Sequence, residues 1–210
     1  MTAPTGRAVA AAGHLGDAET ARSGLESADP SVRAIALGAL ERLGALTDDA
    51  LTAALADCDP MVRRRAAEVA ATHPQVDLTS ALDDRDASVI EVAAWACGEH
   101  EHDRLEIVDR LISLARAADD ALVREAAVAA LGAIGSGHGL PAILAATTDK
   151  PAVRRRAVLA LAPFDGLEVE AAIDRALDDR DWQVRQAAED QLTIIEDASR
   201  TDREDSETDG

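Results

Sequence analysis

Histidine and cysteine are the residues of this sequence best suited to metal or nucleophilic chemistry. His100 and His102 lie in an acidic run over residues 98–103, where alternate side chains of an extended loop could face one transition-metal ion. The same run also fits a solvated insertion, and we favour that interpretation, which predicts no metal site. The remaining histidines stand apart near expected turns: His14, His73 and His138.

The two cysteines do not indicate nucleophilic catalysis. Cys97 lies on the apolar side of an expected helix, which is typical of a small buried hydrophobic residue. Cys58 lies between Asp57 and Asp59, whose negative charges disfavour a thiolate. The sequence contains no P-loop, nucleophile elbow or dinucleotide-binding glycine pattern. We therefore predict no enzyme and no cofactor, and two unpaired thiols favour the reducing cytoplasm.

The charge balance argues against nucleic acid as a partner. The formal net charge is −19, from 21 Lys and Arg against 40 Asp and Glu. Two basic triplets, Arg63–Arg65 and Arg154–Arg156, could contact phosphates, but the helices expected between them carry Glu91 and Glu125. No apolar run reaches the roughly 18–20 residues of a membrane span, and the first residues lack the apolar core of a signal peptide. We expect neither nucleic-acid nor membrane binding.

The apolar residues favour a helical fold. Aromatic residues make up only 1% of the sequence, whereas hydrophobic residues make up 47% and are mainly Ala, Leu, Val and Ile. A core of such small and aliphatic side chains requires close approach of backbones, which helix packing provides. Sheets usually draw on β-branched and aromatic residues instead. The aromatic residues are Trp95, Phe164 and Trp182.

The pattern Asp-x-x-Val-Arg-x-x-Ala recurs at separations of 27–34 residues. The Asp of this pattern suits a helix N-cap, and in three repeats a Pro follows the cap position at the first helical position. In repeat five the cap position holds Lys150, and the adjacent Asp149 could replace it as the cap. The Val, the Ala four residues later and further apolar residues form one stripe at helical spacing. The pairs are Val32 and Ala36, Val62 and Ala66, Val89 and Ala93, Val123 and Ala127, Val153 and Ala157, and Val184 and Ala188.

Each repeat is too small to bury its own apolar face, so neighbouring repeats must stack. The predicted fold is all-α, an α-solenoid (alpha-alpha superhelix) of about six helical hairpins over residues 7–197. Residues 1–6 are expected to be frayed, and residues 198–210 to form a disordered acidic tail. A first helix is expected ahead of each anchor helix, over residues 17–27, 47–56, 76–82, 103–117, 139–147 and 167–177.

The run D-x-x-V-R-x-x-A-x-x-A-L-G, clearest at residues 120–135, resembles the HEAT-like repeat of the phycobilisome-lyase type, and the resemblance covers residues 15–195. It implies a family that includes bilin-lyase subunits, a di-iron deoxyhypusine hydroxylase, DNA-repair glycosylases and plain scaffolds, so the fold does not select one function. In the hydroxylase, His-Glu pairs follow the motif Arg, and none of the six repeats has such a pair there.

If the second helices line the concave face, as the resemblance implies, the residues two, six and nine positions after each anchor valine point outward. Trp95 is the large aromatic residue among them and is a candidate binding hot spot, although it could instead pack against a neighbouring helix. Gly98, Ala129 and Gly132 would leave a shallow cleft beside it. The predicted partner-binding residues are Trp95, Arg64, Glu91, Glu125, Arg155 and Leu159.

The first Arg of each motif has a structural role in this interpretation, because it can pair with the cap aspartates of neighbouring repeats. The second Arg of each triplet, Arg64 or Arg155, would instead meet acidic groups on the partner. The sequence therefore favours a non-catalytic, monomeric HEAT-repeat scaffold that binds a protein or peptide. The alternative is an accessory subunit of a bilin-lyase-like or other maturation enzyme, and a metal-dependent hydroxylase is disfavoured.

Overall fold

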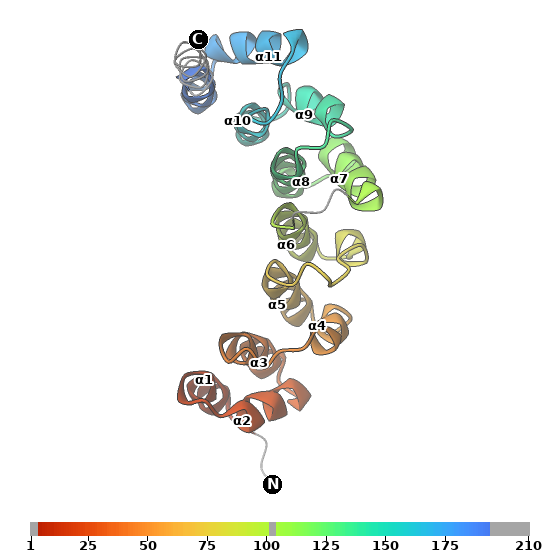
Figure 1. Cartoon of the computed structure of the whole chain (residues 1–210), viewed down its shortest axis with the longest axis vertical. Coiled ribbons are helices and arrows are strands. Elements are labelled where there is room, and N and C mark those ends of the chain that lie inside the picture. Colours follow the sequence, from red (N-terminus) through yellow and green to blue (C-terminus); the bar gives the residue numbers. More distant parts are fainter. Residues whose placement is uncertain (1–3, 101–103, 194–210) are drawn as a thin grey trace, which may run out of the picture. The chain divides into compact units, whose positions relative to one another are not determined.

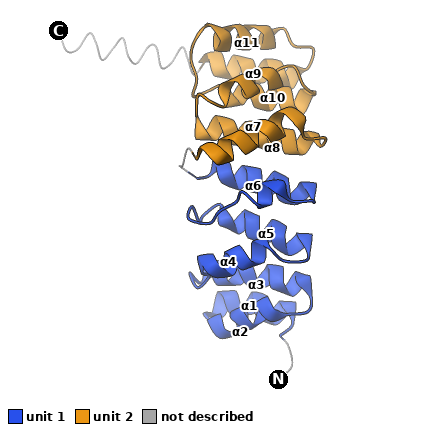
Figure 2. Cartoon of the chain, turned by 90° about the vertical axis from the view of Figure 1, so that its right-hand side faces the viewer, with its two compact units in different colours: residues 1–102 blue, residues 103–210 orange. Residues whose placement is uncertain are grey.

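A computed structural model describes residues 4–100 and 104–193 of the chain. Every regular element in these two ranges is a helix, so the predicted all-α fold is confirmed. The chain divides into two compact units, residues 1–102 (unit 1) and residues 103–210 (unit 2), shown in Figure 2. Each unit is described by itself.

In unit 1 the longer helices α1, α3, α5 and α6 follow one another as packed neighbours in one layer (Figure 1). The shorter elements pack on them from the other side: α2 and η1 on α3, α4 on α5, and η2 on α6. The elements are α1 (Gly6–Leu15), α2 (Ala18–Ser23), η1 (Gly24–Glu26), α3 (Pro30–Arg42), α4 (Asp48–Leu55), α5 (Pro60–Ala70), η2 (Ala81–Asp83) and α6 (Ala87–Gly98).

Unit 2 repeats this two-layer arrangement. Helices α8 and α10 pack against each other in one layer, while α7, α9 and α11 follow one another in the second layer. Residues 182–193 form a further helix. The preceding helices of this unit are α7 (Leu105–Ala117), α8 (Ala121–Ile134), α9 (Leu140–Ala146), α10 (Pro151–Ala160) and α11 (Leu167–Leu177).

Aspartate side chains begin the anchor helices as predicted. Asp29 accepts a hydrogen bond from the backbone N of Ser31 at 2.8 Å, which satisfies an amide that the first helical turn leaves free. Lys150 makes no side-chain cap at α10. Asp149 accepts from the backbone N of Lys150 and not from α10, so it does not replace the missing cap. The other capping aspartates are Asp59, Asp86, Asp120 and Asp181.

The repeated apolar stripe forms the core of both units. The six anchor valines are at most 5% exposed, and the six alanines that follow them are fully buried. Because the alanine side chain is a single methyl group, the helix backbones can approach closely at these positions. The periodicity therefore predicted the buried face of each anchor helix correctly.

Two predicted segments differ from the structure. Residues 76–82 were expected to form a helix, but only the short η2 appears there, because Asp77 binds the backbone N and hydroxyl of Thr79 and these local hydrogen bonds compete with a helix. At the N-terminus, Thr5 caps α1 and Gly6 begins it, so the predicted frayed segment does not reach these residues. The predicted acidic tail, residues 198–210, lies outside the described residues.

The motif arginines connect successive repeats through paired hydrogen bonds. Arg63 donates from Nε and Nη2 to the two carboxylate oxygens of Asp84, at 2.6 and 2.8 Å, and from Nη1 to the carbonyl of Asp57 at 2.9 Å. The planar guanidinium group of arginine matches the geometry of a carboxylate, so that two parallel hydrogen bonds can form. We call this set the Arg–Asp ladder; its pairs are Arg33–Asp57, Arg63–Asp84, Arg124–Asp149 and Arg154–Asp179.

The acidic partners of the ladder correct the sequence prediction. Arg63 does not pair with the cap residue Asp86 but with Asp84, two residues earlier, whose carboxylate also accepts from the backbone N of Asp86 at 2.9 Å. The hydrogen bond from Arg63 lowers the pKa of Asp84, and it outweighs the opposing effect of burial. Each ladder aspartate therefore fixes both the arginine of the previous repeat and the turn that enters the next helix.

One step of the ladder is missing from the sequence. The positions equivalent to Arg63 and Asp84 in the following step hold Ile90 and Ala118, which cannot form an ion pair. Because Ile90 stands at the motif position of the arginine, the third repeat contributes no arginine to the ladder. Among the described residues, each unit keeps two Arg–Asp pairs of its own.

Candidate partner-binding site

The predicted binding residues divide equally between the two units. Unit 1 contains Arg64 on α5 and both Glu91 and Trp95 on α6. Arg64 is exposed, Glu91 is half-buried, and Trp95 keeps 44% of its surface exposed. An aromatic side chain that is partly held by its helix and partly exposed to solvent is suited to bury further surface on binding.

In unit 2, Glu125 lies on α8, and Arg155 and Leu159 lie on α10. The carboxylate of Glu125 is 3.6 Å from Nε of Arg156, so the third arginine of this triplet, and not Arg155, faces it. Leu159 lines a hollow of about 220 Å³ between α8 and α10, together with Ala129 and Gly132. Ala129 and Gly132, two of the small residues predicted to form a cleft, thus line a hollow with α10 within unit 2.

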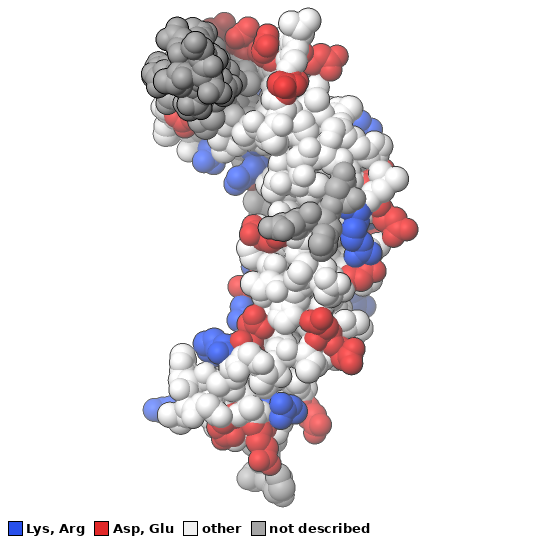
Figure 3. All heavy atoms as spheres, viewed as in Figure 1, with Lys and Arg blue, Asp and Glu red and all other residues white. Residues whose placement is uncertain are grey.

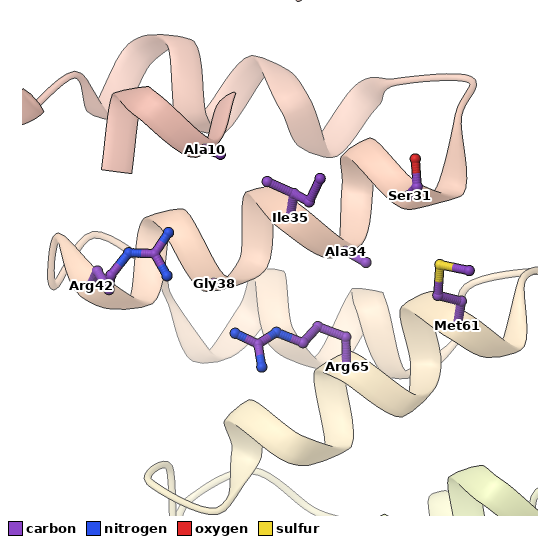
Figure 4. A pocket seen from close by; sticks show the side chains of 8 residues that line it. All are labelled: Ala10, Ser31, Ala34, Ile35, Gly38, Arg42, Met61 and Arg65. Carbon is purple, nitrogen blue, oxygen red and sulfur yellow. The ribbon is translucent and has the colours of Figure 1, made fainter. Parts of the chain in front are cut away.

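A larger hollow of about 460 Å³ lies on the surface of α1, α3 and α5 in unit 1. Figure 4 shows its lining: Ile35 and Gly38 stand on α3 between Arg42 at one end and Met61 at the other, and Arg65 reaches across from α5. We call it the unit 1 hollow; its lining residues are Ala10, Ser31, Ala34, Ile35, Gly38, Arg42, Met61 and Arg65.

The two neighbouring arginines of α5 differ in their relation to this hollow. Arg65 lines it, whereas Arg64, the arginine predicted to meet the partner, does not. An added Cβ on Gly38 would overlap the guanidinium of Arg65, so the absence of a side chain at Gly38 is what allows Arg65 to lie there. Glycine inside an otherwise regular helix was the available signal, since it indicates close approach by a neighbouring group.

Charges on the protein surface are mixed. On the face shown in Figure 3, Lys and Arg side chains occur in small separate groups among Asp and Glu. This face offers no continuous basic stripe of the kind that follows a phosphate backbone. The arginines of the hollows are thus local cationic positions on an acidic protein.

His73 connects three segments of unit 1. Its Nε2 lies 2.9 Å from Glu41 at the end of α3, and its Nδ1 lies 2.8 Å from Asp48 in the first turn of α4. Burial of the imidazole lowers its pKa, but the hydrogen bonds and charges of Glu41 and Asp48 outweigh this effect, so the pKa of His73 is raised above its ordinary value. The protonated ring therefore stabilises the junction of these helices.

We expect His73→Gln to remove a pH-dependent part of the stability. The contribution of a group with a raised pKa is complete below its unfolded pKa, about 6.5, and is lost as pH rises through the folded value. The free energy of unfolding, measured by urea denaturation between about pH 6 and pH 9, should differ between wild type and variant most at the acidic end, by about 1 kcal/mol. His138→Gln, which breaks an exposed pair with Asp109, is the control and should cost little at any pH. A constant difference would contradict this role of His73.

Metal binding finds little support in the described part of the chain. No group of three or more His, Cys, Asp or Glu side chains is placed there to share an ion. Nε2 of His100 lies 2.8 Å from the carbonyl of Ala70, at the end of α5, while His102 lies outside the described residues. Cys97 is buried, Cys58 is exposed, and neither forms a disulfide bond. None of the helices in the described ranges has the length and apolar character of a membrane span.

Comparison with known proteins agrees with this architecture. The sequence matches the family of HEAT repeats over residues 76–161, which span the third to fifth anchor helices. No curated protein sequence matches the chain significantly.

Solved structures with the same fold cover nearly the whole chain. An engineered protein is 21% identical with a TM-score of 0.61, over 92% of this chain and 61% of its own length, so this chain spans less than two thirds of it. The Escherichia coli protein YibA is also 21% identical, with a TM-score of 0.62, over 94% of this chain and 78% of its own. Human deoxyhypusine hydroxylase, in complex with glycerol, is 20% identical over 91% and 78% of the two chains, with a TM-score of 0.48.

The helical layers, the repeated anchor motif and these matches define the class: the chain is an α-solenoid. More particularly, residues 76–161, which are less than half of the chain, match the family of HEAT repeats, so its repeats are similar to HEAT repeats.

Proposed function

We propose that this protein is a non-catalytic scaffold that binds a protein or peptide along the exposed surface of its second helices, with Trp95 as an anchor. We also propose that its repeats are of the phycobilisome-lyase type, because the D-x-x-V-R-x-x-A motif resembles the motif of that type. We also propose that the protein is a monomer in the cytoplasm, where Cys58 and Cys97, which form no disulfide bond, would stay reduced.

The exposure of Trp95 is the observation that carries the proposal. Its helix, α6, otherwise consists of small and aliphatic residues with one carboxylate, Glu91. The indole of Trp95 is the only aromatic side chain of α6, and 44% of its surface is exposed. Tryptophan is enriched at binding hot spots because it buries a large rigid surface and can also donate one hydrogen bond. Arg64 and Glu91 occupy equivalent positions on the adjacent helices α5 and α6, and would add charge-based selectivity around the anchor.

Trp95→Ala tests the proposal in the full chain. Tagged wild type, Trp95→Ala and Trp182→Ala would be used in parallel for affinity purification with mass spectrometry. Trp182 is 65% exposed on the last described helix, so its variant removes a comparable side chain at a different place. We expect Trp95→Ala to lose the specific partner, with a Kd about thirtyfold weaker for the isolated pair, whereas Trp182→Ala keeps it. Equal recovery by all three proteins would reject Trp95 as the anchor, and recovery of no specific protein would reject the function.

A further inference from the structure

The unit 1 hollow has two chemically different ends. At one end, Met61 is 54% exposed on α5, and Ala34 and Ile35 on α3 continue the lining toward the middle of the hollow, which gives a partly flexible apolar surface (Figure 4). Methionine adapts its shape to apolar side chains and is frequent on peptide-binding surfaces. At the other end, the guanidinium groups of Arg42 and Arg65 border the same hollow. A ligand that fills it must therefore present an apolar group and an anionic group side by side.

The positions of the two arginines make their charge available at the surface. Arg65 binds Glu68 through Nη1 at 2.9 Å, while its Nη2 lies over Gly38 on the floor of the hollow. Arg42 is exposed and forms no ion pair with another residue of the described ranges. Its Nη2 would be 3.1 Å from a Cβ added to Gly13, so this cation also lies against a glycine backbone and not beside a carboxylate.

The smaller hollow of unit 2 offers less positive charge. Arg156 occupies the position equivalent to Arg65 and, like Arg65, lies beside a carboxylate, that of Glu125 at 3.6 Å. The lining of that hollow, however, contains no second arginine. The unit 1 hollow is about twice as large, and of the two it alone combines two arginines with an apolar floor.

We infer that the unit 1 hollow binds an acidic segment of a protein partner, in which an apolar side chain contacts Met61 and Ile35 and an adjacent carboxylate binds Arg42 and Arg65. Charge complementarity carries this choice: on a chain of net charge −19, two neighbouring guanidinium groups beside an apolar floor select carboxylates. The inference rests on the proposed function and adds the chemistry of the partner.

Fluorescently labelled synthetic peptides test the inference with the full chain. One probe alternates Leu and Asp, and a second probe of equal length and charge alternates Ser and Asp. Fluorescence anisotropy at about 0.15 M salt suppresses the general repulsion between acidic molecules, because charges more than about 8 Å apart are then largely screened. We expect the Leu-Asp probe to bind and the Ser-Asp probe to bind at least tenfold more weakly, since it lacks apolar side chains.

Arg65→Glu and Arg22→Glu form a matched pair of variants. Both change the net charge equally, but Arg65 lines the hollow, whereas Arg22 is exposed on α2 and does not. We expect Arg65→Glu, and likewise Arg42→Glu, to weaken binding of the Leu-Asp probe at least tenfold, and Arg22→Glu to change it less than twofold. Thermal unfolding of each variant verifies that the fold is intact.

Three results would overturn the inference: equal binding of both probes, equal effects of Arg22→Glu and Arg65→Glu, or no binding of the Leu-Asp probe. A synthetic peptide of residues 198–210 that binds as tightly as this probe, and depends on Arg65, would also overturn it by identifying the chain's own acidic segment as the occupant. The proposed function fails separately. If Trp95→Ala loses its partner while Arg42→Glu and Arg65→Glu retain it, the scaffold function stands and the assignment of the hollow does not.

Discussion

Arg63→Met should lower the free energy of unfolding by about 3–5 kcal/mol, the range for removing one partner of a buried ion pair. The side chains of Arg63 and Asp84 are only 7% and 8% exposed, so the substitution leaves a carboxylate with little access to water. The same change removes the hydrogen bond from Arg63 Nη1 to the carbonyl of Asp57 at 2.9 Å. Because a domain is stable by about 5–15 kcal/mol in total, unit 1 should become markedly less stable.

Urea denaturation followed by circular dichroism measures this loss, and Arg64→Met is the matched control. Arg64 is exposed on the same helix, so its substitution should change the stability by less than about 0.5 kcal/mol. The double variant Arg63→Met with Asp84→Leu should recover part of the loss, because no unpaired charge then remains buried. A loss of less than about 1 kcal/mol in Arg63→Met would show that the ladder does not hold the repeats together.

Gly132→Val should destabilise unit 2 by about 3 kcal/mol, because α8 and α10 are in close contact at this residue. A Cβ added to Gly132 would lie 2.6 Å from Cβ of Ala160, 2.7 Å from its Cα and 2.9 Å from its carbonyl oxygen. Two of these atoms belong to the backbone, so the clash can be relieved only by moving one helix. Helix propensity opposes the effect by less than about 1 kcal/mol and does not change its sign.

Gly137→Val is the control for this substitution. A Cβ added to Gly137, in the turn after α8, meets no atom within 4 Å, so its stability in urea should stay close to that of wild type. Combining Gly132→Ala with Ala160→Gly should restore only part of the stability of Gly132→Ala, since the Cα and carbonyl of residue 160 remain in the way. Full tolerance of Gly132→Val would contradict the close contact of α8 with α10.

Some properties of the site followed from local sequence and others did not. The motif indicated that the first Arg of each repeat is structural, because a repeated Arg beside a repeated Asp can pair across repeats. The motif could not show that Arg63 pairs with Asp84 and not with Asp86, because these two aspartates are only two residues apart in the sequence. Only the fold shows that Asp86 is occupied by the amide of Ser88 while Asp84 faces the guanidinium.

The choice between neighbouring residues on the second helices also required the fold. Arg64 and Arg65 differ by one position, which corresponds to a rotation of about 100° around a helix. Periodicity locates the buried stripe of α5 reliably, because burial affects every repeat, but it locates the exposed side only coarsely. The packing of α5 on α3 places Arg65 over Gly38, and this contact between residues far apart in the sequence decides which arginine lines the unit 1 hollow.

The amino-acid sequence alone determined the helical class, the repeat length, the N-capping aspartates and the buried Val and Ala of every anchor helix. These features depend on local hydrogen bonds and on helical spacing, which are properties of residues close together in the chain. The tertiary structure alone decided the partners in the Arg–Asp ladder, the close contact at Gly132 and the lining of the two hollows. These features depend on how neighbouring helices fit against each other, and that fit is set by packing between residues that the sequence separates by about one repeat.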